Sequence, residues 1–170
     1  FQGSMLNVKK DILEKSLEVN FYSHHNIVQK IANIMVSQGF GGSISLNLSK
    51  QSINPGKDFG PYGIAKASSL FSMKQYALEF GKYNIRVNGI NADRIKSGLL
   101  TDKFIKERAK ARNISSNEYL NNNLLQKQVT AEDVAEAFFA QLSFEKTTGN
   151  IITVDGGNIE ASLRSVSYTH

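Results

Sequence analysis

Cysteine is absent from this chain of 170 residues, which excludes a disulfide framework, a thiol nucleophile and a metal site built on thiolates. Histidine is scarce as well. The adjacent His24 and His25 would point about 100° apart on a helix, and only His170 remains, so we expect no metal site. The sequence has no run of about 20 apolar residues and no secretory signal. We therefore expect a cytoplasmic protein without a membrane partner.

The formal charge of +5 raises the question of a nucleic-acid partner. One segment is rich in basic residues, but Asp102 and Glu107 are interleaved with them, and aromatic residues for base stacking are not grouped there. This pattern is typical of a solvated helix face, so we expect no nucleic-acid partner. The basic residues of the segment are Lys103, Lys106, Arg108, Lys110 and Arg112.

Helical and strand-like periodicities alternate along the chain without repeats. They predict, in order, a helix over 9–38, a strand over 43–48, a loop over 50–59, a helix over 60–81, a strand over 85–90, one or two short helices between 98 and 123, a helix ending near 142, and a strand over 150–154. Thr130 and Asp133 form a capping-box pattern for the last helix. Strands joined through helices pair in parallel with right-handed crossovers, which predicts an α/β fold with three parallel strands.

The segment Tyr62-Gly63-Ile64-Ala65-Lys66 carries the clearest chemical signal. On a helix, Tyr62 and Lys66 stand one turn apart, with roughly 5–6 Å between their Cβ atoms. A free phenol has a pKa near ~10, and a nearby ammonium favours the phenolate, so Lys66 is placed to lower the pKa of Tyr62. Such a tyrosine can act as general acid or base on an alcohol/carbonyl pair. The alternative is a chance match, because on many helices a Tyr packs while a Lys four residues later is solvated.

Two polar residues upstream favour the chemical interpretation. Ser49 ends a strand-like run over 42–49, and its hydroxyl can hold a reacting oxygen beside Tyr62. Asn20 lies next to the apolar stripe of the first helix, where an amide is costly unless it is hydrogen-bonded. The predicted stripe consists of Leu13, Leu17, Phe21, Ile27 or Val28, Ile31 and Met35. Two further strand-like segments, 84–91 and 149–157, follow the Tyr62 helix along the chain.

In this order and spacing, residues 12–160 resemble the second half of a short-chain dehydrogenase/reductase. The resemblance implies Tyr62 as acid/base, Lys66 as the group that lowers its pKa and binds the nicotinamide ribose, and Ser49 as the residue that orients the substrate oxygen. It implies that Asn20 supports a water relay to Lys66. The cofactor of the complete protein would be NAD or NADP, and the catalysed step would be hydride transfer.

The loop after the 85–90 strand departs from the family pattern. In the family this loop usually reads Asn-Pro-Gly and contacts the nicotinamide carboxamide, whereas here it reads Asn91-Ala92-Asp93-Arg94-Ile95. We expect Asn91 and Ile95 to contribute to the cofactor site, with Ile95 keeping the backbone contact. The missing proline and glycine leave the exact shape of this loop open. The interval between Tyr62 and Lys66 also argues against the enoyl-reductase branch, where it is longer.

A narrower resemblance concerns the dehydrogenase part of bifunctional rhamnulose-phosphate aldolase/alcohol dehydrogenase proteins. It rests on Ser49-Lys50 with Pro55-Gly56-Lys57, on residues 124–129, and on residues 149–158 with Arg164. In that family an aldolase segment precedes the dehydrogenase, whose expected substrate is a small hydroxy-aldehyde such as lactaldehyde. The substrate is thus expected to be a small alcohol or aldehyde.

A glycine-rich phosphate turn is missing. Dinucleotide-binding folds open with a strand, such a turn and a helix, but the cluster at 39–42 lies between a predicted helix and a strand and therefore marks a helix end. Residues 1–4 resemble the remnant of a cleavable tag before Met5. We therefore interpret 5–170 as the C-terminal half of a dehydrogenase domain, and we expect this chain alone to bind no cofactor and to be inactive.

Half of a parallel sheet would leave the 43–48 strand without an outer neighbour, and such an edge promotes association. In the family, the helices that carry Asn20 and Tyr62 pack against another subunit, so we expect a homo-oligomer through these helices. A non-catalytic, oligomeric interaction module is the alternative to an enzyme.

Overall fold

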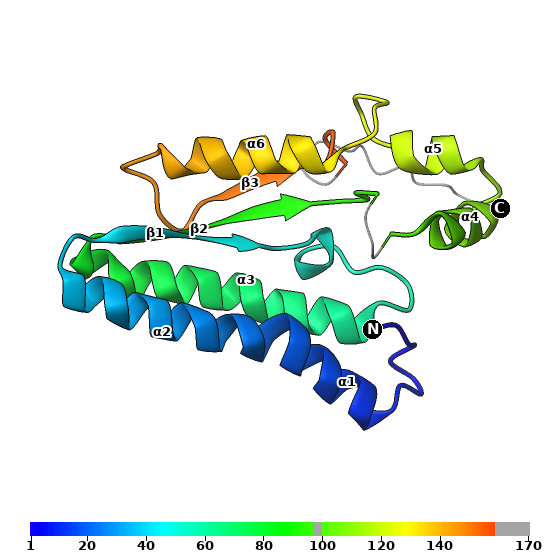
Figure 1. Ribbon diagram of the computed structural model, residues 1–170. Helices are drawn as coiled ribbons and strands as arrows, with labels where there is room; N and C mark the ends of the chain where they lie inside the picture. The colour runs from blue at the N-terminus through cyan, green and yellow to red at the C-terminus, as the bar shows by residue number, and fades with distance from the viewer. Residues whose placement is uncertain (97–99, 159–170) are drawn as a thin grey trace.

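A computed structural model describes residues 1–96 and 100–158 of the chain. Its centre is a three-stranded parallel sheet in the order β1-β2-β3, formed by Gly42–Asn47, Ile85–Ala92 and Ile151–Val154 (Figure 1). The predicted α/β fold with three parallel strands is therefore confirmed. The sheet is a Rossmann-like arrangement in which consecutive strands are connected through helices.

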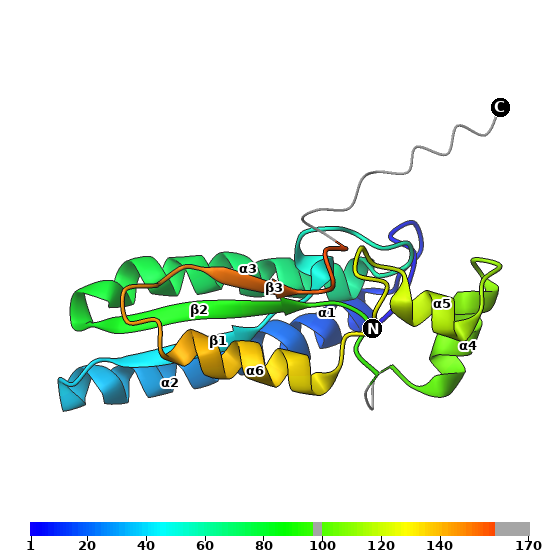
Figure 2. The ribbon, with the colours of Figure 1, turned by 90° about the horizontal axis from the view of Figure 1, so that it is seen from above.

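Helices cover both faces of the sheet, and two more lie near its carboxyl end (Figures 1 and 2). The second helix and the Tyr62 helix pack on one face, the first helix packs against the Tyr62 helix, and the last helix packs on the other face. The helices are α1 (Lys10–Leu17), α2 (Ser23–Gln38), α3 (Gly60–Phe80), α4 (Asp102–Lys110), α5 (Ser116–Asn121) and α6 (Ala131–Leu142). This arrangement leaves the carboxyl ends of β1 and β2 facing α4 and α5.

Alternating side chains of the strands build a separate core on each face. On the α2/α3 side, Ile85 and Val87 of β2 pack against Met73 of α3. On the α6 side, Ile90 of β2 packs with Val134 of α6. A parallel sheet requires such cover on both faces, so β2, at the centre of the sheet, is the most buried strand.

The predicted helix over 9–38 contains a π-helical turn at Glu18–Tyr22, between α1 and α2. A π turn accommodates one additional residue, which rotates the following apolar positions around the helix axis. Val28 is therefore buried in the core, whereas Ile27 and Ile31 are exposed, although the sequence placed Ile31 in the buried stripe. The assignment of Ile31 was wrong because a pattern with a uniform 3.6-residue period does not foresee the inserted turn.

The other boundaries agree with the predictions to within a few residues. Gly39 ends α2 in the left-handed conformation, with φ of 73°. The capping box of Thr130 and Asp133 opens α6 as predicted. β2 continues to Ala92, beyond the predicted end at residue 90.

At the amino terminus, the Gly3 amide donates to the Asp58 carbonyl over 2.9 Å, so residues interpreted as a tag remnant lie against the loop before α3.

None of the helices in the two described ranges is long and apolar enough to cross a membrane.

Candidate active site

Ser49 and Tyr62 meet at the carboxyl end of β1. Ser49 lies just beyond the strand and caps a short 3-10 turn over Lys50–Ser52 by accepting from the Gln51 amide. Tyr62 stands in the first turn of α3, directly after Pro61, whose fixed backbone suits that position. The Ser49 side chain lies close enough to the Tyr62 phenol to lower its pKa, and both residues line one cavity. The two residues that the sequence assigned to one site are therefore in contact.

Lys66 follows Tyr62 by one turn of α3, as predicted. Its Nζ lies 5.8 Å from the centroid of the Tyr62 ring and donates to the Asn47 carbonyl at the end of β1 over 3.1 Å. Lys66 is only 6% exposed, which is unusual for a lysine. Its ammonium thus connects α3 to β1 underneath the Ser49–Tyr62 pair.

The titration behaviour of the pair differs from the prediction. Burial raises the pKa of Tyr62 above its ordinary value, and the hydrogen bond from Ser49 offsets this only in part. Burial also lowers the pKa of Lys66. The expected lowering of the Tyr62 pKa is not found in this structure, because desolvation of the phenol is the largest effect and Lys66 is not among the causes of the shift.

Asn20 lies in the π-helical turn and reaches α3 through its backbone. Its carbonyl accepts from the Ser69 hydroxyl over 2.9 Å, and its amide Nδ2 donates to the Ser16 carbonyl over 3.2 Å. Ser69 follows Lys66 by one turn on α3. The structure thus connects Asn20 with the helix that carries Lys66, while the predicted water relay between the two side chains stays a prediction.

The loop after β2 contains one residue with a left-handed backbone and a carboxylate with several polar partners. Arg94 adopts a left-handed backbone with φ of 54°, and Asp93 accepts three polar groups at one carboxylate oxygen. These groups are Lys50 Nζ at 3.2 Å, Arg94 Nε at 3.4 Å and Asn158 Nδ2 at 2.6 Å. At the positions where the family has Pro-Gly, the Asp93 carboxylate connects the loops after β1, β2 and β3 through its three partners.

Asn91 is fully buried at the carboxyl end of β2, and strand alternation places it on the same face of the sheet as Ile85 and Val87. Both polar atoms of its side chain lack a hydrogen-bond partner among the residues that the structure describes. An unsatisfied buried amide is costly and calls for a polar partner. Neither Asn91 nor Lys66 is among the residues that line the cavity described below, so their predicted contacts with the nicotinamide–ribose end of a dinucleotide, which would supply a hydride acceptor or donor, stay predictions.

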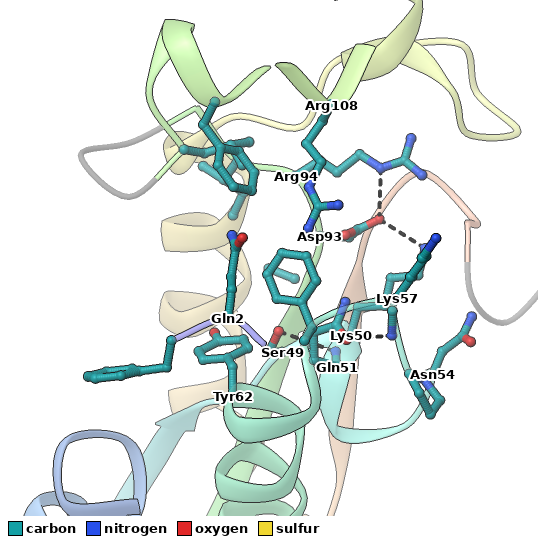
Figure 3. Close-up of a pocket in the computed structure, with 18 of the residues that line it drawn as sticks. Gln2, Ser49, Lys50, Gln51, Asn54, Lys57, Tyr62, Asp93, Arg94 and Arg108 are labelled. Carbon is teal, nitrogen blue, oxygen red and sulfur yellow. Dashed lines mark hydrogen bonds and ion pairs between the residues drawn. The ribbon is translucent and has the colours of Figure 1, made fainter. Parts of the chain in front are cut away.

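A cavity of about 620 Å³ opens above the Ser49–Tyr62 pair. Figure 3 shows Ser49 and Tyr62 near its floor and Arg94 and Arg108 on the opposite side. Ile95 lines the cavity together with Ala92 and Asp93, while its predicted contact with the cofactor stays a prediction. The cavity is large enough for a small substrate beside the reacting groups.

The sequence did not predict the contacts of Arg108 with aromatic rings. The guanidinium carbon of Arg108 lies 4.6 Å from the Phe59 ring centroid and 5.3 Å from that of Phe104. Arg112 stacks likewise on Tyr119, at 5.2 Å. The expectation of a solvated face without grouped aromatic residues is therefore wrong for this side of the helix. The i, i+4 spacing of Phe104 and Arg108 was the available signal.

Comparison with known proteins agrees with this geometry. The sequence model of the family described as Enoyl-(Acyl carrier protein) reductase matches residues 1–158. The chain is 37% identical over 131 residues to the "Uncharacterized oxidoreductase YuxG" of Bacillus subtilis, covering 72% of this chain and 19% of that protein. It is 29% identical over 155 residues to D-erythrulose reductase of Gallus gallus, covering 89% of this chain and 60% of that protein.

The fold is also found in solved structures. The crystal structure of sorbitol-6-phosphate 2-dehydrogenase SrlD from Erwinia amylovora matches with a TM-score of 0.85 at 21% identity, over 94% of this chain and 64% of that chain. The chain thus spans less than two thirds of the length of each of these three relatives. The family match over 158 residues, together with the Ser49–Tyr62–Lys66 arrangement, shows that the chain belongs to the short-chain dehydrogenase/reductase family.

Proposed function

We propose that this chain is the catalytic part of a nicotinamide-dependent oxidoreductase that interconverts a small alcohol or hydroxy-aldehyde and its oxidised form. The observation that carries the proposal is the Ser49–Tyr62 pair at the floor of a cavity, with the buried Lys66 one turn away. These are the residue types that move a proton to or from an alcohol oxygen.

In this proposal, Tyr62 exchanges the proton of the substrate oxygen while a hydride moves between the substrate carbon and the cofactor. The Ser49 hydroxyl holds the same oxygen and orients it toward the phenol. Because burial raises the pKa of Tyr62, the phenol is protonated at neutral pH and is ready to donate in carbonyl reduction. Alcohol oxidation requires the phenolate, so the oxidative rate should rise with pH.

The relatives support a small, hydroxylated substrate. D-erythrulose reductase is named for a hydroxy-ketone, and YuxG is a much longer protein, since the matched part makes up 19% of it. We propose that the parent of this chain is a longer protein of the aldolase/alcohol dehydrogenase type acting on a small hydroxy compound. The Tyr62–Lys66 interval supports a place outside the enoyl-reductase branch, although the matched family takes its description from that activity.

A non-catalytic interaction module is the second candidate. Exposed apolar side chains on α2 and α3, among them Ile27 and Phe71, support association of the chain with a partner. The two candidates differ in cofactor dependence. We propose that the chain alone does not bind NAD⁺ or NADP⁺ tightly, because the pyrophosphate-binding turn is not in its sequence, whereas the longer parent binds one of them.

The test of catalysis is Tyr62→Phe in the longer protein. Loss of the phenolic oxygen removes the proton donor, so we expect kcat for carbonyl reduction to fall at least about 100-fold, with the cofactor dissociation constant nearly unchanged. Absorbance of the reduced nicotinamide measures kcat, and calorimetry measures the cofactor dissociation constant.

The matched control is Tyr83→Phe, which removes a phenol that is exposed beyond the end of α3 and does not line the cavity. An unaltered turnover number in Tyr62→Phe would exclude the assigned role. Absence of nicotinamide-dependent turnover in the wild-type parent would favour the interaction module.

A further inference from the structure

The cavity above Tyr62 is strongly cationic. Its lining includes five basic side chains, Lys50, Lys57, Arg94, Arg108 and Arg112, but a single acidic one, Asp93. Asp93 is already engaged by Lys50 and Arg94 at one oxygen, and Arg94 also donates to the carbonyls of Tyr119 and Asn122. Lys57, Arg108 and Arg112 therefore have no acidic side chain to offset them in this cavity.

Arg108 is held in a fixed orientation. The Phe59 and Phe104 rings flank its guanidinium, and their own centroids lie 6.4 Å apart in an edge-to-face arrangement. Aromatic contacts of this kind orient the planar fork of an arginine and reduce the entropy lost when it binds a ligand.

One nitrogen of this guanidinium is unsatisfied. Nη2 of Arg108 is buried and has no hydrogen-bond partner among the described residues. A charged N–H group that is removed from water without an acceptor is costly, so a site of this kind favours an incoming oxyanion. Carboxylates and phosphates match the guanidinium fork.

The distance between Arg108 and the reacting centre suits a small molecule. The Phe59 ring contacts both, since its centroid lies 6.5 Å from that of Tyr62 and 4.6 Å from the Arg108 guanidinium carbon. A substrate with its hydroxyl or carbonyl oxygen at Ser49 and Tyr62 can thus extend a charged end past a single ring to Arg108. All three residues line the same cavity with Phe59.

We propose that the substrate of this site is a small hydroxy compound that carries an anionic group, a carboxylate or a phosphate ester, and that Arg108 binds this group. The inference rests on the proposed oxidoreductase function and narrows its substrate class. It places a neutral aldehyde such as lactaldehyde among the weak ligands of the cavity.

Three compounds with one carbon skeleton test the proposal: glycerol, glycerate and glycerol 3-phosphate. We would titrate each into the 170-residue chain at constant ionic strength and follow the side-chain Nε–H signals of its arginines by NMR. We expect saturable binding of at least one anion with a shift of the Arg108 signal, and no such binding of glycerol. The anion that binds more tightly identifies the charged group of the substrate.

Arg108→Gln should weaken that binding at least about tenfold, since a charge-assisted hydrogen bond is lost. Arg108→Lys retains the charge without the fork and should bind with intermediate affinity. Lys110→Gln removes one charge from the same helix outside the cavity and should bind like the wild type. Circular dichroism would confirm that each variant is folded.

Three outcomes would overturn the proposal. These are equal affinity of the wild type and a folded Arg108 variant, equal binding of glycerol and the anions, and the absence of saturable anion binding. A fourth result, displacement of the bound anion by ADP, would also overturn the proposal, because Arg108 would then recognise a phosphate of the cofactor.

The longer protein separates this proposal from the function itself. Arg108→Gln should lower the kcat/KM ratio of the anionic to the neutral substrate about tenfold, whereas Tyr62→Phe should abolish turnover and retain anion binding. Arg108-dependent anion binding without nicotinamide-dependent turnover would refute the oxidoreductase and leave the anion site. Nicotinamide-dependent turnover that does not discriminate between the charged and neutral compounds would support the oxidoreductase function and refute the anion site.

Discussion

Lys66 illustrates how an individual residue departs from the most stable choice at its position. A lysine that is 6% exposed and bonds to one backbone carbonyl is expensive to bury, and desolvation accordingly lowers its pKa. Such groups are characteristic of functional sites, where a perturbed titration serves chemistry at the expense of stability.

Replacement of Lys66 by Met should therefore raise the free energy of unfolding at pH 7, by up to about 1 kcal/mol after loss of the bond to Asn47. The sign follows from proton binding. Between the lowered folded pKa and the ordinary unfolded value, the unfolded chain binds more protons, so the wild type gains stability as pH rises through that window. Urea unfolding at pH 7 and at about pH 9.5 should show the advantage of Lys66→Met shrinking.

Lys74→Met is the control for this prediction, because Lys74 is exposed on the same helix. It should change stability little at either pH. A wild type that is clearly more stable than Lys66→Met at pH 7 would contradict the interpretation of Lys66 as a residue that costs stability.

At this scale the sequence predicted which groups meet, but not how they titrate. The Tyr62–Lys66 spacing on a helix determines that the two side chains share a face, and Ser49 arrives beside them because β1 ends there. The pKa of Tyr62 depends on how much water the packed loop excludes from the phenol. Burial is a property of the tertiary structure, and it reverses the predicted direction of the shift.

Among the elements, the π-helical turn between α1 and α2 has the clearest structural role. It exposes the Asn20 carbonyl to α3, where the Ser69 hydroxyl donates to it, and Ser16 in the preceding turn donates to the Pro61 carbonyl over 3.0 Å. These two bonds hold the first helix against the amino-terminal half of the Tyr62 helix. Irregular turns of this kind are frequent at functional sites.

Ser69→Ala should lower the free energy of unfolding by about 1 kcal/mol, because it removes the hydroxyl that connects α3 to the Asn20 carbonyl and leaves that carbonyl with His24 Nδ1 as its side-chain partner. The neighbouring Ser68→Ala is the matched control, since the Ser68 hydroxyl bonds only within its own helix to the Ile64 carbonyl, and it should cost less than about 0.5 kcal/mol. Thermal or urea unfolding of both variants measures the difference. Equal stability of the two variants would show that the π turn does not depend on α3.

At the scale of the whole molecule, exposed apolar rows indicate association. Ile27, Ile31 and Ile34 form one row on α2, and Ile64, Phe71 and Leu78 form another on α3, at spacings that keep each row on one helix face. β1 pairs only with β2 in the described part of the chain, which leaves its outer edge open. Together these features support the prediction of a homo-oligomer through the first helix and the Tyr62 helix.

Phe71→Glu tests this prediction, because Phe71 is 71% exposed at the centre of the α3 row. A buried charge at an apolar contact should weaken self-association at least about tenfold and shift the mass measured by light scattering toward that of a monomer. Phe139→Glu on α6, at 81% exposure on the opposite face of the sheet, should leave the mass unchanged. A monomeric wild type would exclude the assembly.

The sequence by itself determined the order of strands and helices, because the apolar periods alternate clearly, and it determined that Tyr62, Lys66 and Ser49 share a site. It could not determine the π turn, the junction at Asp93 or the setting of Arg108. Each of these depends on contacts between segments far apart in the chain: α1 with α3, the three strand ends with one another, and α4 with the loop before α3. Only the packed fold brings these groups together, and their positions in it decide their partners.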